Sequence, residues 1–145
     1  MTKVPSQVFA AELISEFVAL GVTNFYLSPG ARSQALAIAV GQLAQAGQID
    51  LTVVLDERSM SFAALGRALG SGSPSVLITT SGTAVANLHP AVLEANHSGI
   101  PLILLTADRP KVLRNKGANQ TTQQPGIFAD ALRLMLDIDA PGENT

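Results

Sequence analysis

Four short apolar runs recur along the chain, and each is followed by a cluster of small, polar or turn-forming residues. The runs are 24–27, 51–55, 76–78 and 102–105, and the clusters that follow them are 28–33, 56–58, 79–83 and 106–110. Alternation of strand, polar corner and helix predicts repeated right-handed βαβ units, and hence an α/β fold around a parallel sheet. Ligands of such sheets bind at the carboxyl ends of the strands, so the polar clusters mark the expected site.

The spacing of apolar residues sets the expected elements. Helices are predicted over 6–20 with Ser6 as N-cap, 33–46, 59–69, 83–96 and 128–136, and strands over 22–27, 51–55, 75–79 and 101–106. Pro90 is expected to kink or divide its helix, because proline lacks the amide hydrogen that a helix interior uses. Residues 109–126 show no periodicity and are predicted to form a loop.

Composition narrows the class of protein further. The chain has 145 residues, which suits one domain, and 47% of them are hydrophobic but only 14% charged. Because an average chain has about 25% charged residues, we expect strands buried on both faces and some surface covered by a partner. The net charge of −2 argues against nucleic acid or anionic membranes as partners. No apolar run approaches the ~20 residues of a membrane span.

The chain contains no cysteine, which excludes disulfides and thiolate metal sites and fits a reducing cytosol. Its first residues lack a basic segment followed by an apolar stretch, so no signal peptide is predicted and a cytoplasmic location is expected. The last six residues, 140–145, resemble a linker after a helix without a partner strand. We therefore expect one domain over 1–139, with further domains following in a longer protein.

Glu57 is the most informative single residue. It comes directly after the second predicted strand, where a partly desolvated carboxylate can bind a ligand nitrogen strongly. Taken alone, the spacing favours the other interpretation, an acid at a helix N-terminus that pairs with Arg58 or with the helix dipole.

Two corners of small residues have similar alternatives. Segment 28–33 opens a helix after a strand, so its backbone amides and the Arg32 guanidinium could bind an anion. It could equally be a tight turn with Ser33 as N-cap. In segment 80–83 the backbone can approach a flat ligand closely, and ordinary helix capping is the alternative. Neither corner matches a P-loop or a G-x-G-x-x-G motif.

The loop after the fourth strand concentrates basic residues. Four of the nine in the chain fall here, namely Arg109, Lys111, Arg114 and Lys116, with amides nearby at Asn119, Gln120, Gln123 and Gln124. A solvated loop is one interpretation, and a loop that gathers acidic ligands at the sheet's carboxyl end is the other. His89 and His97 lack metal-ligand spacing and are interpreted as structural or exposed. No metal cluster and no Ser-His-Asp set is visible.

Together, segments 28–33, 56–58, 80–87, 104–110 and 117–120 resemble, in order, the motifs of the amino-terminal pyrimidine-binding domain of thiamine diphosphate-dependent enzymes. The resemblance is strongest to the MenD family, the 2-succinyl-5-enolpyruvyl-6-hydroxy-3-cyclohexene-1-carboxylate synthases of menaquinone biosynthesis. It implies a three-layer α/β/α fold with a flavodoxin-like parallel sheet. The ordered set of motifs also favours the ligand-binding interpretation of Glu57.

The resemblance implies roles for particular residues. Glu57 would be catalytic, because in this class the glutamate hydrogen-bonds N1′ of the cofactor's aminopyrimidine and so promotes loss of the proton from thiazolium C2. The cofactor-binding set would be Glu57, Pro29, Ser81, Gly82, Thr83 and Asn87. The substrate-binding set would be Arg32, Ser33, Arg109, Asn119 and Gln120. No metal ligand is expected in this chain, since Mg²⁺ (or manganese) and the diphosphate are held by a carboxyl-terminal domain in this class.

The activity implied is a transferase that decarboxylates 2-oxoglutarate and adds the carbanion to isochorismate, in menaquinone or phylloquinone biosynthesis. The active site would form between subunits of a homodimer or homotetramer, so this chain alone is expected to be inactive and to bind the cofactor weakly. Ala31 stands where the family usually has serine, and His89 where it usually has tyrosine. Another thiamine diphosphate lyase of the acetolactate synthase type, or a non-catalytic nucleotide-binding module, remains as an alternative.

Overall fold

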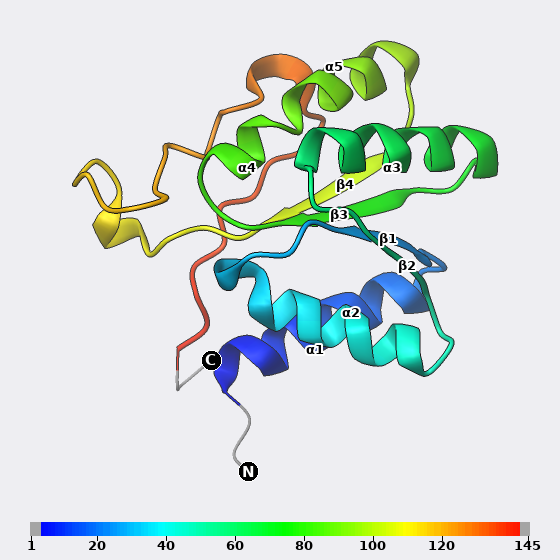
Figure 1. The fold of residues 1–145 in the computed structure, drawn as a ribbon, viewed down its shortest axis with the longest axis horizontal. Coiled ribbons are helices and arrows are strands. Elements are labelled where there is room, and N and C mark those ends of the chain that lie inside the picture. The colour runs from blue at the N-terminus through cyan, green and yellow to red at the C-terminus, as the bar shows by residue number, and fades with distance from the viewer. Residues whose placement is uncertain (1–3, 143–145) are drawn as a thin grey trace.

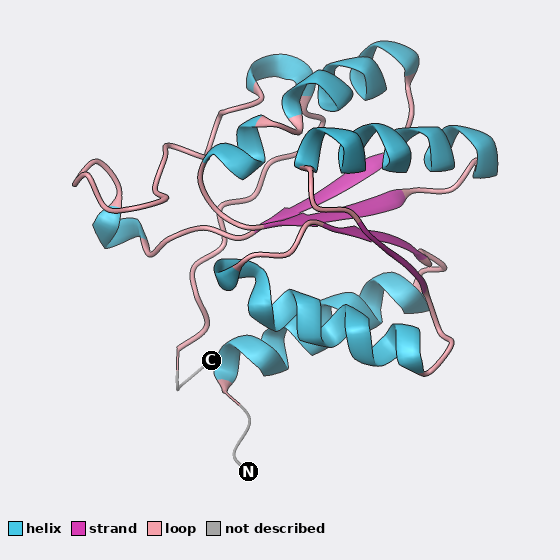
Figure 2. Cartoon of the chain, in the orientation of Figure 1, coloured by secondary structure: helices cyan, strands magenta, loops and turns pink. Residues whose placement is uncertain are grey.

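The computed structural model describes residues 4–142, and the start of the chain (1–3) and the end of the predicted linker (143–145) lie outside that range. Helices cover both faces of a single parallel sheet, as Figures 1 and 2 show. α1 and α2 form one layer, and α3, α4 and α5 form the opposite layer. The predicted three-layer α/β/α class is therefore confirmed.

The elements follow one another in the predicted alternation. In chain order they are α1 (Pro5–Ala19), β1 (Asn24–Leu27), the 3₁₀ helix η1 (Ala31–Ser33), α2 (Gln34–Gln45), β2 (Asp50–Val53), α3 (Glu57–Ser71), β3 (Ser75–Thr79), α4 (Thr83–Ala86), α5 (His89–Ser98), β4 (Leu102–Thr106), η2 (Lys111–Leu113) and η3 (Ala129–Ala131). The strand order is β2-β1-β3-β4 with every pair parallel. The order reverses between β1 and β3, and such a switch point is where α/β sheets bind ligands.

β3 is the centre of the core. All five of its residues are buried. Val76 and Ile78 pack with residues of α1 and α2, whereas Leu77 packs with residues of α3 and α5. A strand buried on both faces needs a continuous apolar run, which explains why the sequence pattern located this strand correctly.

β2 lies at the edge of the sheet and is largely exposed, so the expectation of burial on both faces fails for this strand. Leu55, in the connection that follows it, is 82% exposed. The apolar side chains left uncovered here account for part of the high hydrophobic content of the chain.

Two predicted helix starts are wrong by one or two residues. α1 begins at Pro5 with Val4 as N-cap, and Ser6 makes no capping bond. Proline suits the first helical position because its ring fixes a helical φ and its missing amide hydrogen has no partner there. α3 begins at Glu57 rather than at 59, because the carboxylate of Asp56 accepts a hydrogen bond from the Ser59 amide at 2.7 Å.

The helix predicted over 83–96 is divided, one of the two expected outcomes. α4 ends before Asn87, and α5 begins at His89 with Pro90 in its first turn. A proline is tolerated there because the first amides of a helix have no intrahelical acceptor.

The helix predicted over 128–136 is wrong. Only η3 forms, and residues 132–142 are irregular. Leu132, Leu134 and Leu136 recur at every second residue, a spacing typical of extended chain. Leu134 and Leu136 are 73% and 69% exposed, so no apolar helix face is buried that would stabilise a helix here.

Candidate active site

The carboxyl ends of the strands lie together at the left of Figure 1, with η1, the start of α3, α4 and the loop after β4 around them. At the switch point the corner after β1 (28–33) touches the corner after β3 (79–83), because a Cβ on Gly30 would overlap the side chain of Thr80. Only glycine permits this approach of the β1 corner to the β3 corner. The sequence-predicted clusters are thus brought to one end of the sheet.

Glu57 is the first residue of α3 and is half-buried. Asn87, just past the end of α4, donates from Nδ2 to Glu57 Oε2 at 3.4 Å. Within residues 4–142, the second carboxylate oxygen has no hydrogen-bond partner and no cation pairs with Glu57, so the predicted alternative of an ion pair with Arg58 is not found. The carboxylate is therefore oriented from one side and available on the other.

Ser28 holds the connection between β2 and α3, which leads to Glu57. Its hydroxyl is buried and donates to the carbonyl oxygen of Val54 at 2.7 Å. The Val54 amide in turn donates to Leu27 O at 3.0 Å. Two hydrogen bonds thus attach the end of β2 to the end of β1, three residues before Glu57.

The β3 corner is held by the loop after β4. The Ser81 hydroxyl donates to Gln120 O at 2.9 Å, and Gln120 Nε2 donates to Ser81 O at 3.1 Å. The amide of Gly82 donates to Gln124 Oε1 at 2.9 Å. Gly82 has φ +86°, a backbone conformation that favours glycine. Gln120, predicted on the substrate side, therefore touches the predicted wall of the cofactor pocket.

The other predicted residues lie around this cluster. Arg109 donates from Nε and Nη2 to Asn119 O at 3.1 and 3.0 Å. Pro29 and Thr83, which starts α4, are exposed. Ser33 is buried, and its hydroxyl donates to Gly30 O at 3.1 Å instead of capping a helix.

Arg32 is less closely joined to the cluster. Its side chain is exposed and lines a hollow of about 270 Å³ with the first residues of α1. Among residues 4–142 no acceptor binds its guanidinium. This arginine therefore remains available to an anion, but the structure does not bring it into contact with Arg109.

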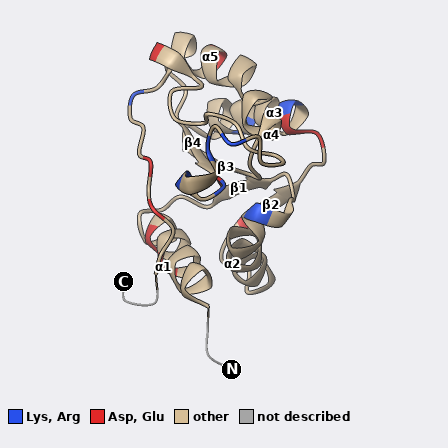
Figure 3. Cartoon of the chain, turned by 90° about the vertical axis from the view of Figure 1, so that its left-hand side faces the viewer, with Lys and Arg blue, Asp and Glu red and all other residues tan. Residues whose placement is uncertain are grey.

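In the basic loop, Arg114 and Lys111 are paired with carboxylates, whereas within residues 4–142 Arg109 and Lys116 form no ion pair, so both interpretations of the loop stay open. Arg114 pairs with Asp108 at 2.7 Å and Asp137 at 2.8 Å, and Lys111 pairs with Asp139 at 2.7 Å. The hydrogen bond from Arg114 holds the pKa of Asp137 below its usual value, and the hydrogen bond to Asp139 raises the pKa of Lys111. Figure 3 faces this end of the molecule and shows blue (Lys, Arg) and red (Asp, Glu) segments around the strand ends, among them the start of α3.

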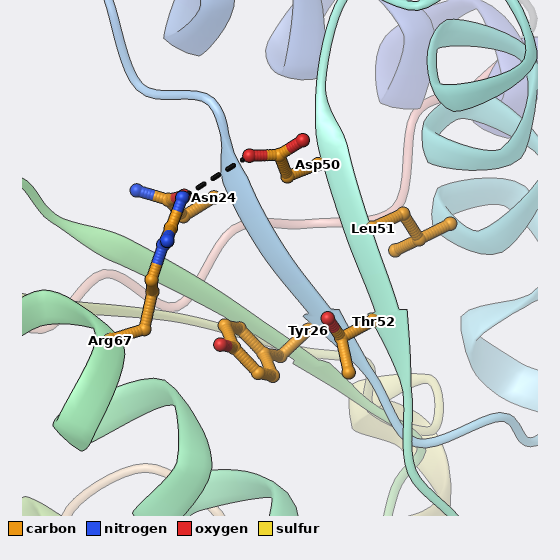
Figure 4. Close-up of a pocket in the computed structure, with 6 residues that line it drawn as sticks. All are labelled: Asn24, Tyr26, Asp50, Leu51, Thr52 and Arg67. Carbon is orange, nitrogen blue, oxygen red and sulfur yellow. Dashed lines mark hydrogen bonds and ion pairs between the residues drawn. The ribbon is translucent and has the colours of Figure 1, made fainter.

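A second hollow, of about 350 Å³, lies on the β1–β2 part of the sheet (Figure 4). Arg67 enters it from α3 and donates to Asn24 Oδ1 at 2.9 Å and to Asp50 Oδ2 at 3.2 Å. Asn24 and Asp50 begin their strands, so this hollow is away from the predicted site, and its charges are already paired.

Several other features have a purely structural character. His89 is half-buried and meets the ring of Phe128 edge-on at 5.6 Å, which confirms its packing role.

Within the described residues, no group of three or more His, Asp or Glu side chains could hold a metal ion. No helix in that part of the chain is long and apolar enough to cross a membrane.

Sequence reasoning named Gln124 among the amides near the basic loop but missed which side chains hold this loop in place. Gln124 is buried and joins Gly82 to Ala107, to whose carbonyl its Nε2 donates at 3.1 Å. Asp108 and Asp137 bind Arg114 from two distant segments. An aperiodic stretch gives no signal that distinguishes Gln124 from Gln123, because the difference is made by tertiary contacts alone.

The cap of the helix that carries Glu57 predicts a pH effect. The hydrogen bond from the Ser59 amide lowers the folded-state pKa of Asp56 below its ordinary value of 3.8. A lowered folded pKa stabilises the fold above the unfolded pKa, and this stabilisation is lost as the pH falls through the folded value. Asn at position 56 caps a helix without titrating.

Urea unfolding of the wild type and of Asp56→Asn, at about pH 6 and about pH 3, measures this effect. The wild type should lose stability relative to the variant on acidification. An equal difference at both pH values would contradict the assignment.

The structure is thus an α/β domain with a doubly covered parallel sheet, and a carboxylate and two glycine-containing corners lie at the carboxyl ends of its strands. Residues 8–130 match the family model described as "Thiamine pyrophosphate enzyme, N-terminal TPP binding domain". The chain therefore belongs to this family, and the predicted resemblance to thiamine diphosphate-dependent enzymes is confirmed.

Three curated relatives carry the name 2-succinyl-5-enolpyruvyl-6-hydroxy-3-cyclohexene-1-carboxylate synthase. The chain is 50% identical to that of Leifsonia xyli over 94% of its own length and 23% of the relative. It is 51% identical to that of Clavibacter michiganensis over 96% of its own length and 24% of the relative. It is also 51% identical to that of Haloarcula marismortui, over 92% of its own length and 22% of the relative. The chain thus spans about a quarter of the length of these relatives.

Proposed function

We propose that this chain is the amino-terminal, pyrimidine-binding part of a thiamine diphosphate-dependent synthase of the MenD family. The whole enzyme would decarboxylate 2-oxoglutarate and join the product to isochorismate in menaquinone or phylloquinone biosynthesis, in the cytoplasm. Identity of about 50% to synthases of this name, over more than nine-tenths of the chain, supports the reaction. The single observation that carries the proposed site is the half-buried Glu57 carboxylate, oriented by Asn87 at the sheet's switch-point end.

The donor set suits an aminopyrimidine. A ring nitrogen such as N1′ needs one carboxylic group in the ring plane, and Glu57 has one carboxylate oxygen without a partner in residues 4–142. When bound, thiamine diphosphate supplies a carbon acid that becomes nucleophilic on losing its proton. Glu57 would hold the proton shared with the ring nitrogen, and Asn87 would keep the carboxylate from rotating away.

The two glycine corners would form the wall beside the ring. Gly30 and Gly82 leave no room for a side chain, because Thr80 and Gln120 occupy the space where a Cβ would stand, so the ends of β1 and β3 are closely packed. Ser81 and Gly82 are held by Gln120 and Gln124, which fix the wall before a ligand arrives. Pro29 and Thr83 would contribute contacts from the corners on either side.

The substrate carboxylates would be bound on the loop side. The proposed arginines are Arg32, which has no partner in residues 4–142, and Arg109, whose side chain donates to the backbone oxygen of Asn119, whereas Arg114 is bound by two aspartates. Ser33, Asn119 and Gln120 complete the proposed substrate set. Gln120 has φ +55°, an uncommon conformation for a residue other than glycine, and such strain is typical of binding sites.

A second subunit and a further domain would complete the site. Apolar side chains next to Glu57 remain exposed, with Leu55 at 82% and Phe62 at 44%. Such a surface supports a homodimer or homotetramer with the active site between subunits. Mg²⁺ or manganese and the diphosphate would be held by a carboxyl-terminal domain after residue 139, so this chain alone should not turn over substrate.

A substrate assay of the full-length protein tests the proposal. Product should form from 2-oxoglutarate and isochorismate only when thiamine diphosphate is present, and pyruvate should not replace 2-oxoglutarate. Turnover of pyruvate to acetolactate would instead indicate a lyase of the acetolactate synthase type. Activity that does not depend on thiamine diphosphate would contradict both.

A further inference from the structure

We propose that Arg114 is a positioning residue that sets the substrate side of the site through Asp108, an inference that rests on the proposed function. Arg114 touches none of the proposed cofactor or substrate residues. It acts on Arg109 and Asn119 by fixing the backbone from which they reach the site.

The contacts of Arg114 form a bridge between two segments. Nη2 donates to Asp108 Oδ2 at 2.7 Å, and the guanidinium meets Asp137 through Nη1 at 2.8 Å and Nη2 at 2.9 Å. The side chains of Arg114 and Asp108 are only 14% and 18% exposed. A planar guanidinium can engage two carboxylates in one fixed arrangement, which the ammonium of lysine cannot reproduce.

Asp108 connects Arg114 to the backbone of Arg109, one of the proposed substrate-binding residues. Its Oδ2 is bound by Arg114, whereas its Oδ1 accepts from the backbone amide of Arg109 at 2.7 Å. The side chain of Arg109 donates twice to Asn119 O. The neighbouring Gln120 then hydrogen-bonds Ser81 at the β3 corner. A continuous series of contacts therefore runs from Arg114 to the proposed pocket wall.

Lys111 provides a matched control. It is a cation of the same loop and pairs with the same carboxyl-terminal segment, at Asp137 and Asp139. Within the described residues it forms no ion pair or hydrogen bond with Asp108. If the segment at 137–139 needed only a positive charge to hold it, Lys111→Gln and Arg114→Gln would have similar effects.

Steady-state kinetics of the full-length enzyme distinguish a positioning role of Arg114 from a role limited to pairing with the charges of segment 137–139. Arg114→Gln should raise the KM for 2-oxoglutarate or isochorismate about tenfold, with kcat changed less than about threefold, because displaced binding groups weaken substrate binding before they affect the chemistry. Arg114→Lys should not rescue the KM, and Lys111→Gln should leave it unchanged. An Arg114→Gln enzyme that loses kcat in proportion to its folded fraction, with normal KM, would overturn the inference.

Amide hydrogen exchange of the same full-length variants makes the inference independent of the reaction. Arg114→Gln should speed exchange in residues 107–120, and Lys111→Gln should not. Unchanged exchange would overturn the inference whatever the activity. Faster exchange in an enzyme whose wild type does not use these substrates would uphold the restraint on Arg109 and refute the proposed function.

Discussion

Replacing Glu57 by Gln in the full-length enzyme should leave the fold intact and lower kcat by at least about a hundredfold, the range expected for loss of a positioned acid–base group. The change keeps the size of the side chain and its acceptor for Asn87, whose bond to Oε2 is 3.4 Å. It removes the one group here that can share a proton with a ring nitrogen. Turnover at saturating thiamine diphosphate, with thermal unfolding in parallel, measures both effects.

Glu16→Gln is the matched control, because Glu16 is an exposed glutamate on α1, in the layer opposite α3. It should have the activity and the unfolding temperature of the wild type. A Glu57→Gln enzyme with turnover close to that of Glu16→Gln would show that Glu57 has no catalytic role.

Gly30→Ala should destabilise the domain by about 1–3 kcal/mol, the usual cost of adding a methyl group to a closely packed position. The new Cβ would overlap Cβ, Cγ2 and Oγ1 of Thr80, so no rotation of the threonine side chain relieves the contact. The β1 and β3 corners would have to separate, which would also disturb the pocket wall at Ser81. Urea unfolding and the Kd for thiamine diphosphate measure the two consequences.

The same substitution at Gly41 should have the opposite sign. Gly41 lies inside α2, and a Cβ there would meet nothing within 4 Å. Gly41→Ala should therefore stabilise the domain by about 0.4–1 kcal/mol through the lower entropy of the unfolded chain.

Thr80→Gly removes the overlap at Gly30, so the double variant Gly30→Ala/Thr80→Gly should lose less stability than the sum of the losses in the two single variants. Strict additivity would contradict the close approach of the two corners.

The sequence pattern correctly located those elements that depend on neighbouring residues along the chain. β3 is a continuous apolar run that the structure buries on both faces, and its bounds were predicted correctly. Glu57 was predicted to lie at a strand end because it directly follows the apolar run 51–55. The family resemblance placed Asn87 in the same cofactor-binding set, but its hydrogen bond to Glu57 was not predicted, since thirty residues separate them and no local pattern connects them.

What could not be predicted depends on contacts between distant segments. The helix expected at 128–136 is absent, and Asp137 instead binds Arg114, 23 residues away. Two of the four cations in the basic loop, Lys111 and Arg114, pair with Asp137 and Asp139, which lie more than twenty residues further along the chain. Charge pairing of this kind is set by the folded structure, so the sequence alone did not show which cations of this loop are paired.

Deuterium exchange at thiazolium C2 of the bound cofactor tests the central claim most directly, because it reports loss of that proton without requiring either substrate. In the full-length enzyme with thiamine diphosphate and Mg²⁺, the account predicts exchange at least about a hundredfold slower in Glu57→Gln than in the wild type. Exchange at the wild-type rate in that variant, with the cofactor fully bound, would contradict it.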